Sequence, residues 1–214
     1  MSETHSAPHI GVLAIQGDYE AHAEALRDAG AIPSLVKTAA DLSGPNGQPL
    51  DGLVLPGGES TTMLKFLLPN NGRKGFFDEL KAFVHSRPTF GTCAGAILLA
   101  REVRNPTQPD RPQPSLEALD IAVERNAYGS QADSAILTLE TSLQGGPLET
   151  VFIRAPRIVH TGPGIEILAS RDGSPVLVRQ GNIMAATFHP ELSTDRRVHH
   201  LFVEMVKSRP QTQS

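Results

Sequence analysis

The sequence predicts an α/β protein of three layers, with a mostly parallel central sheet, helices on both of its faces and antiparallel strands added in the second half. From residue 10 to residue 102, short apolar runs alternate with helical patterns, and such alternation indicates βαβ units and a parallel sheet. From residue 119 to residue 186, short strands follow one another with turns between them, which is typical of antiparallel pairing. The length of 214 residues is enough for one sizeable core.

The first half begins with a strand and a helix that the residue pattern delimits. Residues 10–15 form a short apolar run, which favours a fully buried strand. Residues 19–29 carry alanine and leucine at helical spacing, and Gly30 stops this helix. The remaining expected elements of this half are strands at 32–36, 53–55 and 89–90 and helices at 61–67, 75–85 and 94–102.

The second half is expected to consist mainly of short strands. They cover residues 119–123, 135–139, 151–153, 165–168, 176–179 and 183–186, and a helix over 196–206 closes the chain. Two further stretches are expected to be surface loops, at residues 43–49 and 104–115. The second holds four prolines and is long for a connection without structure of its own, which indicates an insertion.

Composition narrows the classes of function. We expect one domain over residues 1–214, with flexible polar tails at 1–8 and 209–214. The net charge of −4 leaves no basic surplus, so nucleic acid is not an expected partner. No apolar run approaches the roughly 20 residues of a membrane span, and the polar start has no signal peptide, so we expect a cytoplasmic protein without a membrane partner. The single cysteine excludes an internal disulfide and a four-cysteine metal site, and we expect no metal and no cofactor.

A candidate nucleophile lies between the expected strand at 89–90 and the expected helix at 94–102. Gly91-Thr92-Cys93-Ala94-Gly95 has the form G-x-C-x-G, the cysteine counterpart of the nucleophile elbow. The thiol of Cys93 would project from the C-terminal edge of the sheet at a helix N-terminus, which favours the thiolate. The backbone N–H of Ala94 would help to bind a developing oxyanion. The alternative is a cysteine buried as a small hydrophobe in a glycine-containing turn.

A candidate base follows the apolar strand at 183–186. His189 can act as a general base toward a thiol, and Glu191 lies two residues further on, so both side chains can point the same way. The carboxylate would then hold the imidazole in one tautomer and orientation. A lone histidine is more often structural, and the sequence has eight. Comparable context is missing at His22, His85, His160, His199 and His200, and the last two have the pattern of helix-surface residues.

A glycine pair follows the third expected strand and opens a helix. In Pro56-Gly57-Gly58-Glu59-Ser60, the two glycines let the backbone approach a ligand closely and free N–H groups to point at an anion. Gly58 is therefore a second candidate oxyanion donor. The alternative is a simple strand-to-helix turn that Glu59 or Ser60 caps.

Seven segments in order along the chain carry a family resemblance. They are Gly11-Val-Leu-Ala-Ile-Gln-Gly17, Leu55-Pro-Gly-Gly-Glu-Ser-Thr-Thr-Met63, Phe90-Gly-Thr-Cys-Ala-Gly95, Val123-Glu-Arg-Asn126, Phe152-Ile-Arg-Ala-Pro156, Phe188-His-Pro-Glu-Leu192 and Leu201-Phe-Val-Glu-Met205. With them the chain resembles the class I, triad-type glutamine amidotransferases. Within that group it is similar to the glutaminase subunits of pyridoxal 5′-phosphate synthase, which the second and fifth segments distinguish from their relatives.

The resemblance implies a flavodoxin-like fold and a role for each matching position. Cys93 would attack the carboxamide of L-glutamine, and His189 and Glu191 would complete a catalytic triad. The implied substrate-binding residues are Gly58, Glu59, Ser60, Arg125, Ile153 and Arg154. An arginine suits the α-carboxylate of glutamine because its fork forms paired, charge-assisted hydrogen bonds. From the residues alone, Arg125 and Arg154 would be surface residues at strand ends.

The resemblance also implies a protein partner. The ammonia would pass to a synthase subunit that builds pyridoxal 5′-phosphate from ribose 5-phosphate or ribulose 5-phosphate and glyceraldehyde 3-phosphate. Docking would order the oxyanion loop and raise a weak basal activity. Gln16, Gly17 and the helix at 19–29 are candidates for that interface.

The chain departs from the family pattern at one motif position, and three other interpretations stay open. Gly129-Ser130-Gln131 stands where the family commonly has Gly-Arg-Gln, so one basic contact is missing. The chain would alternatively serve another amidotransferase, such as imidazole glycerol phosphate synthase, or be a non-catalytic regulatory subunit on the same fold. A third interpretation is a cysteine peptidase or chaperone-like relative, which fits the Gly57-Gly58 loop and the His-Pro-Glu spacing poorly.

Overall fold

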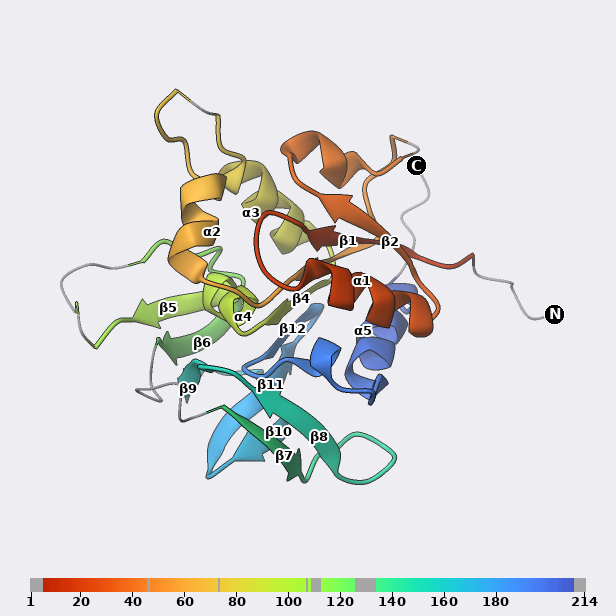
Figure 1. Ribbon diagram of the computed structural model, residues 1–214, viewed down its shortest axis with the longest axis vertical. Coiled ribbons are helices and arrows are strands. Elements are labelled where there is room, and N and C mark those ends of the chain that lie inside the picture. The colour runs from red at the N-terminus through yellow and green to blue at the C-terminus, as the bar shows by residue number, and fades with distance from the viewer. Residues whose placement is uncertain are drawn as a thin grey trace.

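The computed structural model describes residues 6–45, 47–72, 74–106, 108, 113–125 and 134–209 (Figure 1). The expected tails at 1–8 and 209–214, much of the expected loop at 104–115 and the departure at Ser130 lie wholly or partly outside these residues. Within them, no helix is both long and apolar enough to cross a membrane.

A seven-stranded sheet forms the centre of the described structure (Figure 1). Its parallel part runs in the order β2, β1, β3, β4 and β12, and β11 and β10 extend it by antiparallel pairing. This parallel order is that of the flavodoxin-like fold, as expected. The bounds are β1 His9–Leu13, β2 Ile32–Val36, β3 Gly52–Leu55, β4 Thr89–Thr92, β10 Glu166–Arg171, β11 Ser174–Gln180 and β12 Ile183–Ala186.

Helices cover both faces of this sheet and enclose two apolar clusters (Figure 1). On one face, α1 and α5 pack against each other and contribute Leu26 and Phe202 to one cluster. On the other face, α2, α3 and α4 contribute Leu64, Leu80 and Leu98 to the second cluster. The bounds are α1 Tyr19–Asp28, α2 Ser60–Leu67, α3 Phe77–Ser86, α4 Ala94–Leu99 and α5 Arg197–Lys207, with short 3-10 helices at Ala39–Ser43 and Pro190–Leu192.

The second half is more divided than the sequence predicts. Only β10, β11 and β12 join the central sheet, and β12 joins it in parallel. Two smaller sheets take the other strands, in the orders β5-β6-β9 and β7-β8. The bounds are β5 Ala100–Arg104, β6 Leu119–Glu124, β7 Ala135–Leu139, β8 Leu148–Phe152 and β9 Arg157–Thr161. Strand β9 was not expected, and Ile153 follows β8 instead of ending it.

The prediction of a helix over 94–102 is correct for residues 94–99 and wrong for residues 100–102. Helix α4 ends at Leu99, and the chain continues as β5, which pairs in parallel with β6. The carbonyl oxygens of Leu98 and Leu99 accept hydrogen bonds from the backbone N–H groups of Leu116 and Ala118. These contacts with a distant segment satisfy the helix end, and they override the local helical pattern.

Glycines let α4 lie directly against the strands beside it. A Cβ atom on Gly95 would come within 2.0 Å of the carbonyl oxygen of Leu55 in β3. A Cβ atom on Gly91 would come within 2.6 Å of the backbone of Gly95. The start of α4 is therefore held against β3 and β4 at a separation that only glycine allows.

We predict that Gly95→Ala costs far more stability than Gly30→Ala. The first change forces backbone apart, which overpacks the interior and costs about 3 kcal/mol or more. The second adds a Cβ with no heavy atom within 4 Å and brings only the strain of a left-handed residue, about 1 kcal/mol. Denaturant unfolding of both variants and the wild type measures the difference, and equal losses would contradict the tight contact.

Candidate active site

Cys93 occupies a sharp turn between β4 and α4, as the G-x-C-x-G motif predicts. Its backbone angles are φ 46° and ψ −103°, a conformation that a side-chain-bearing residue rarely adopts. Hydrogen bonds hold the turn, because the N–H of Cys93 donates to the carbonyl of Ala186 at 2.9 Å and its own carbonyl accepts from Ile97 at 3.2 Å. The side chain is almost buried, with 6% of the residue exposed.

His189 lies just beyond the end of β12, beside the nucleophile. Strands β12 and β4 are adjacent and parallel, so the residues that follow them meet at one edge of the sheet. The N–H of His189 donates to the carbonyl of Val151 at 2.8 Å, which anchors the backbone. The Nδ1 of the imidazole lies 2.8 Å from Oε1 of Glu191 in a hydrogen bond, and an interaction with Cys93 acts to raise the pKa of the same ring.

The three side chains form an electrostatically coupled unit. Burial acts to lower the pKa of His189, but the interactions with Cys93 and Glu191 outweigh it and raise that pKa to about 10. Burial acts to raise the pKa of Glu191, but the neighbouring His22 and His189 outweigh it and lower that pKa. At neutral pH the arrangement therefore favours an imidazolium between the sulfur of Cys93 and a carboxylate.

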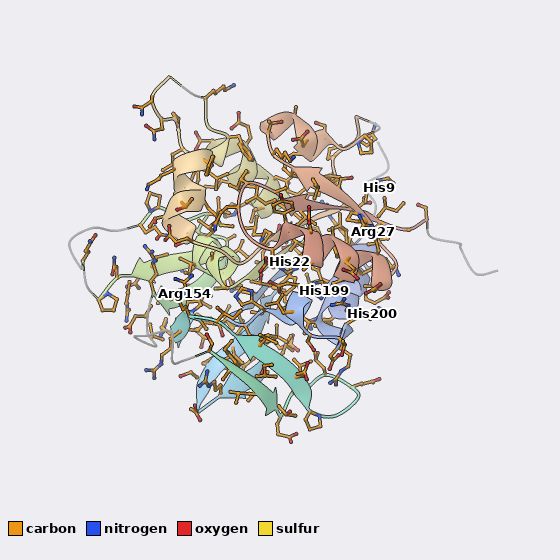
Figure 2. The ribbon with its side chains drawn as sticks, viewed as in Figure 1. His9, His22, Arg27, Arg154, His199 and His200 are labelled. Carbon is orange, nitrogen blue, oxygen red and sulfur yellow. The ribbon has the colours of Figure 1, made fainter. Side chains whose placement is uncertain are left out.

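A cavity of about 310 Å³ opens beside Cys93 and His189. This volume suits a small polar ligand. All the predicted substrate-binding residues line it, namely Gly58, Glu59, Ser60, Arg125, Ile153 and Arg154, together with Gln16, Gly17, Asp18, Gly57, Ile97 and Pro156. Arg154 has a left-handed backbone at φ 45° and lies in the turn after β8 (Figure 2).

Glu59 both caps a helix and holds an arginine of the cavity wall. Its carboxylate accepts hydrogen bonds from the backbone and hydroxyl groups of Thr61 and Thr62 at the start of α2. It also accepts from Nη2 of Arg125 at 3.1 Å. Burial acts to raise the pKa of Glu59, but the hydrogen bonds from both threonines lower it to about 2. Glu59 therefore caps α2 and also lines the cavity, so the two interpretations of this residue do not exclude each other.

Arg125 is part of the cavity and not a free surface residue. Only 13% of its side chain is exposed. Besides Glu59, it donates from Nη1 to Oε1 of Gln113 at 2.5 Å, and the same oxygen accepts from the hydroxyl of Ser60 at 3.1 Å. Gln113 thus ties Arg125 to the start of α2. Sequence reasoning missed it, because it lies in an irregular proline-rich stretch without a motif.

The glycine loop after β3 is packed against its neighbours at van der Waals limits. A Cβ on Gly57 would lie 2.3 Å from Cε1 of His189, and a Cβ on Gly58 would lie 2.5 Å from Oε1 of Gln16. That oxygen accepts a hydrogen bond from the N–H of Glu59 at 2.8 Å. Gly58, with φ 151°, lines the cavity, and its role as an oxyanion donor stays a prediction. Ala94 follows Cys93 directly but is fully buried and does not line the cavity, so its role as a donor stays a prediction.

Two buried histidines lie behind the triad, and sequence analysis predicted no role for either of them. His22 is fully buried on α1, and His199 is fully buried on α5, so the interpretation of His199 as a surface residue is wrong. In Figure 2 the two lie together near the centre of the molecule, and His200 lies closer to its edge. Helix α5 turns the side of His199, with Val198, Phe202 and Val203, toward the core.

One cluster of potential metal ligands shares two residues with the triad. Asp18, His189 and Glu191 offer ligand atoms that lie within 4.8 Å of one another. The Nδ1 of His189 and the Oε1 of Glu191 already share a hydrogen bond of 2.8 Å, which accounts for their closeness. Asp18 is exposed, at the N-cap of α1.

The geometry suits acyl transfer through a thioester. It provides a thiol, a histidine that can take and return a proton, a carboxylate that orients the histidine, and a glycine loop near the reacting carbon. A carboxamide substrate with a charged end would find Arg125 and Arg154 in the cavity wall.

Comparison with known proteins agrees with this geometry. The sequence profile of the SNO glutamine amidotransferase family matches residues 12–208. The pyridoxal 5′-phosphate synthase subunit PdxT of Koribacter versatilis (strain Ellin345) is 55% identical over 199 residues, which cover 93% of this chain and 96% of that protein. The protein of the same name from Solibacter usitatus (strain Ellin6076) is 48% identical over 200 residues, covering 91% and 97%.

A solved structure shares the fold as well as the sequence. The crystal structure of a glutamine amidotransferase superposes with a TM-score of 0.79 at 42% identity and covers 92% of this chain and 98% of that one. The match of the family profile extends over nearly all the described elements, from β1 to α5. This chain belongs to the SNO glutamine amidotransferase family.

Proposed function

We propose that this chain hydrolyses L-glutamine to L-glutamate and ammonia as the glutaminase subunit of a pyridoxal 5′-phosphate synthase. The observation that carries the proposal is the meeting of Cys93, His189 and Glu191 at one edge of the sheet beside a cavity of about 310 Å³. Membership of the glutamine amidotransferase family supports glutamine as the substrate.

The proposed reaction has two steps. With the proton of Cys93 held on His189, the sulfur attacks the carboxamide carbon and a C–S bond forms. The C–N bond breaks as His189 gives that proton to the leaving ammonia. A γ-glutamyl thioester remains. His189 then takes a proton from water, and the hydroxide attacks the thioester carbon. The C–S bond breaks as His189 returns the proton to the sulfur, and glutamate leaves after its γ-carboxyl group gives a proton to solvent. Glu191 holds the imidazole in the same orientation through both steps.

Substrate recognition is proposed to use the residues of the cavity wall. Arg125 and Arg154 line the cavity and would bind the α-carboxylate of glutamine, while Gly58, Ser60 and Ile153 would surround its side chain. Glu59 fixes Arg125 in place. The backbone N–H groups of Gly58 and Ala94 are the proposed oxyanion donors, which would act on the tetrahedral intermediate.

The proposed partner is the synthase subunit that receives the ammonia. Two relatives at 48% identity or more are named as subunits of pyridoxal 5′-phosphate synthase, which supports this partner over imidazole glycerol phosphate synthase. Gln16 and Gly17 lie in the cavity wall next to α1, so a protein that docks there would touch the glycine loop. We propose a single-domain subunit of a heteromeric complex in the cytoplasm, and the single cysteine suits that compartment.

We predict that Cys93→Ala abolishes glutamine hydrolysis and leaves the fold intact. The nucleophile is the only cysteine of the chain, so the loss of turnover should be roughly a thousandfold or more. Glutamate release is measured for the full chain with and without the synthase subunit of the same organism, and circular dichroism checks the fold. Hydrolysis at the wild-type rate in the variant would refute the nucleophile.

We predict that Glu191→Gln lowers the pKa of His189 and slows turnover roughly a hundredfold or more. Because the pKa of about 10 in the folded chain lies above the ordinary value, the protonated imidazole stabilises the fold fully below about pH 6.5 and loses this effect as the pH rises toward 10. Imidazole signals of His189 in NMR spectra should titrate near pH 10 in the wild type and at lower pH in the variant. Identical titrations would remove Glu191 from its role.

A further inference from the structure

A chain of buried polar side chains continues from the triad into the interior. One oxygen of Glu191 accepts from His189, and the other, Oε2, lies 3.3 Å from Nε2 of His22. The same Nε2 lies 3.0 Å from the hydroxyl of Thr92, and Nδ1 of His22 lies 3.1 Å from Nε2 of His199. His22 and His199 are fully buried, so no bulk water reaches either ring.

The contact of His22 with a carboxylate favours one arrangement of protons, in which the hydroxyl of Thr92 can accept from the same Nε2–H. A carboxylate only accepts hydrogen bonds, so the nitrogen of His22 that faces Glu191 must carry a proton. Burial is the largest influence on the pKa of His22 and lowers it, which favours the neutral ring with one N–H. Its Nδ1 must then accept from the Nε2–H of His199. The remaining nitrogen of His199, Nδ1, has no hydrogen-bond partner among the described residues, as suits a nitrogen without a proton.

We propose that His22 is a positioning residue of the triad, which holds Oε2 of Glu191 through its Nε2–H, and that His199 fixes the tautomer of His22. The inference rests on the proposed catalytic role of Glu191. The hydrogen-bond donors then run in one direction, from His199 to His22 to Glu191, and from the other side His189 donates to the same carboxylate.

This contact matters because Glu191 is a buried charge. Among the described residues Oε2 has no hydrogen bond of good geometry, and Nε2 of His22 lies 3.3 Å from it. An unpaired buried oxygen would draw the carboxylate away from its place, and the orientation of His189 depends on that place. The ring of His22 is itself held by Phe90, whose ring lies edge-on at 6.3 Å between centroids.

His22 acts at a distance from the substrate. It does not line the cavity, and no part of it is exposed. The charged or titratable groups that influence it are Glu191, His189 and Asp18, with His199 on the opposite side of its ring. A change at His22 should therefore alter kcat and leave KM nearly unchanged, which separates it from the arginines of the cavity wall.

Three substitutions at His22 separate positioning from packing. Glutamine places an amide N–H where Nε2 stood, asparagine places its amide where Nδ1 stood, and leucine fills the space without a donor. We expect His22→Leu and His22→Asn to lower kcat about tenfold, the usual effect of losing a supporting hydrogen bond. We expect His22→Gln to recover most of the activity. His200→Gln, on the exposed side of the same helix as His199, is the matched control and should behave as the wild type.

A double-mutant comparison with Glu191 decides whether His22 acts by positioning the carboxylate or only by packing. In a Glu191→Gln background the His22→Leu change should cost less than twofold, because the charge that His22 holds is gone. Equal losses in both backgrounds, equal losses for His22→Gln and His22→Leu, or no loss in a folded His22→Leu variant would each overturn the proposal. If the wild-type chain hydrolyses no glutamine, or if its hydrolysis does not depend on Cys93, the proposed function itself would be overturned.

A spectroscopic measurement tests the proton arrangement without turnover. Nitrogen NMR of labelled histidine distinguishes a protonated from an unprotonated ring nitrogen in the full-length chain. We expect the Nε2–H tautomer at both His22 and His199, and in His199→Phe a mixture of tautomers at His22. An Nδ1–H tautomer at His22 in the wild type would contradict the proposal, even if the variants fail to fold.

Discussion

The hydrogen bond between Nδ1 of His189 and Oε1 of Glu191 is the interaction on which the rest of the site depends. Both residues are nearly buried, so the charge on the carboxylate must be balanced where it stands. The imidazole balances it on one side, and this pairing also helps to set the pKa of His189 near 10, where the ring can hold a proton beside the thiol. The nucleophile and its base are brought together because β4 and β12 are parallel neighbours whose C-terminal ends meet.

Close backbone contacts keep this constellation in place. Gly95 allows α4 to touch β3, and Gly57 allows the loop after β3 to touch the ring of His189. The left-handed backbone of Cys93 is a strained conformation that the hydrogen bond to Ala186 helps to retain. The cavity wall is stabilised in a similar way, since Glu59 caps α2 and holds Arg125 at the same time. The contacts that stabilise the fold therefore also fix the positions of the functional groups.

The parts of the structure that local patterns encode could be predicted from the sequence. Strands β2, β7 and β12 have the expected bounds, because apolar runs between turn residues mark them. The triad and the cavity residues followed from motifs and a family resemblance. Strand β9 was missed because its one buried residue, Ile158, gives no alternation, and the end of α4 was missed because distant pairing decides it. The helical spacing of His22 with Tyr19, Ala23 and Leu26 indicates that it faces the core. Its partner Glu191, however, is 191 − 22 = 169 positions away in the sequence. Such contacts need the fold itself.

In the proposed mechanism Cys93 carries the γ-glutamyl group during turnover. The most direct measurement is the intact mass of the full chain, quenched in acid during the hydrolysis of glutamine in the presence of the synthase subunit, followed by peptide mapping. We expect a fraction of the chain to be heavier by one glutamyl group, with the addition on the peptide that contains Cys93. Two results would contradict a thioester at Cys93. One is glutamine turnover without any adduct on that peptide under conditions that preserve a thioester, and the other is an adduct at another residue.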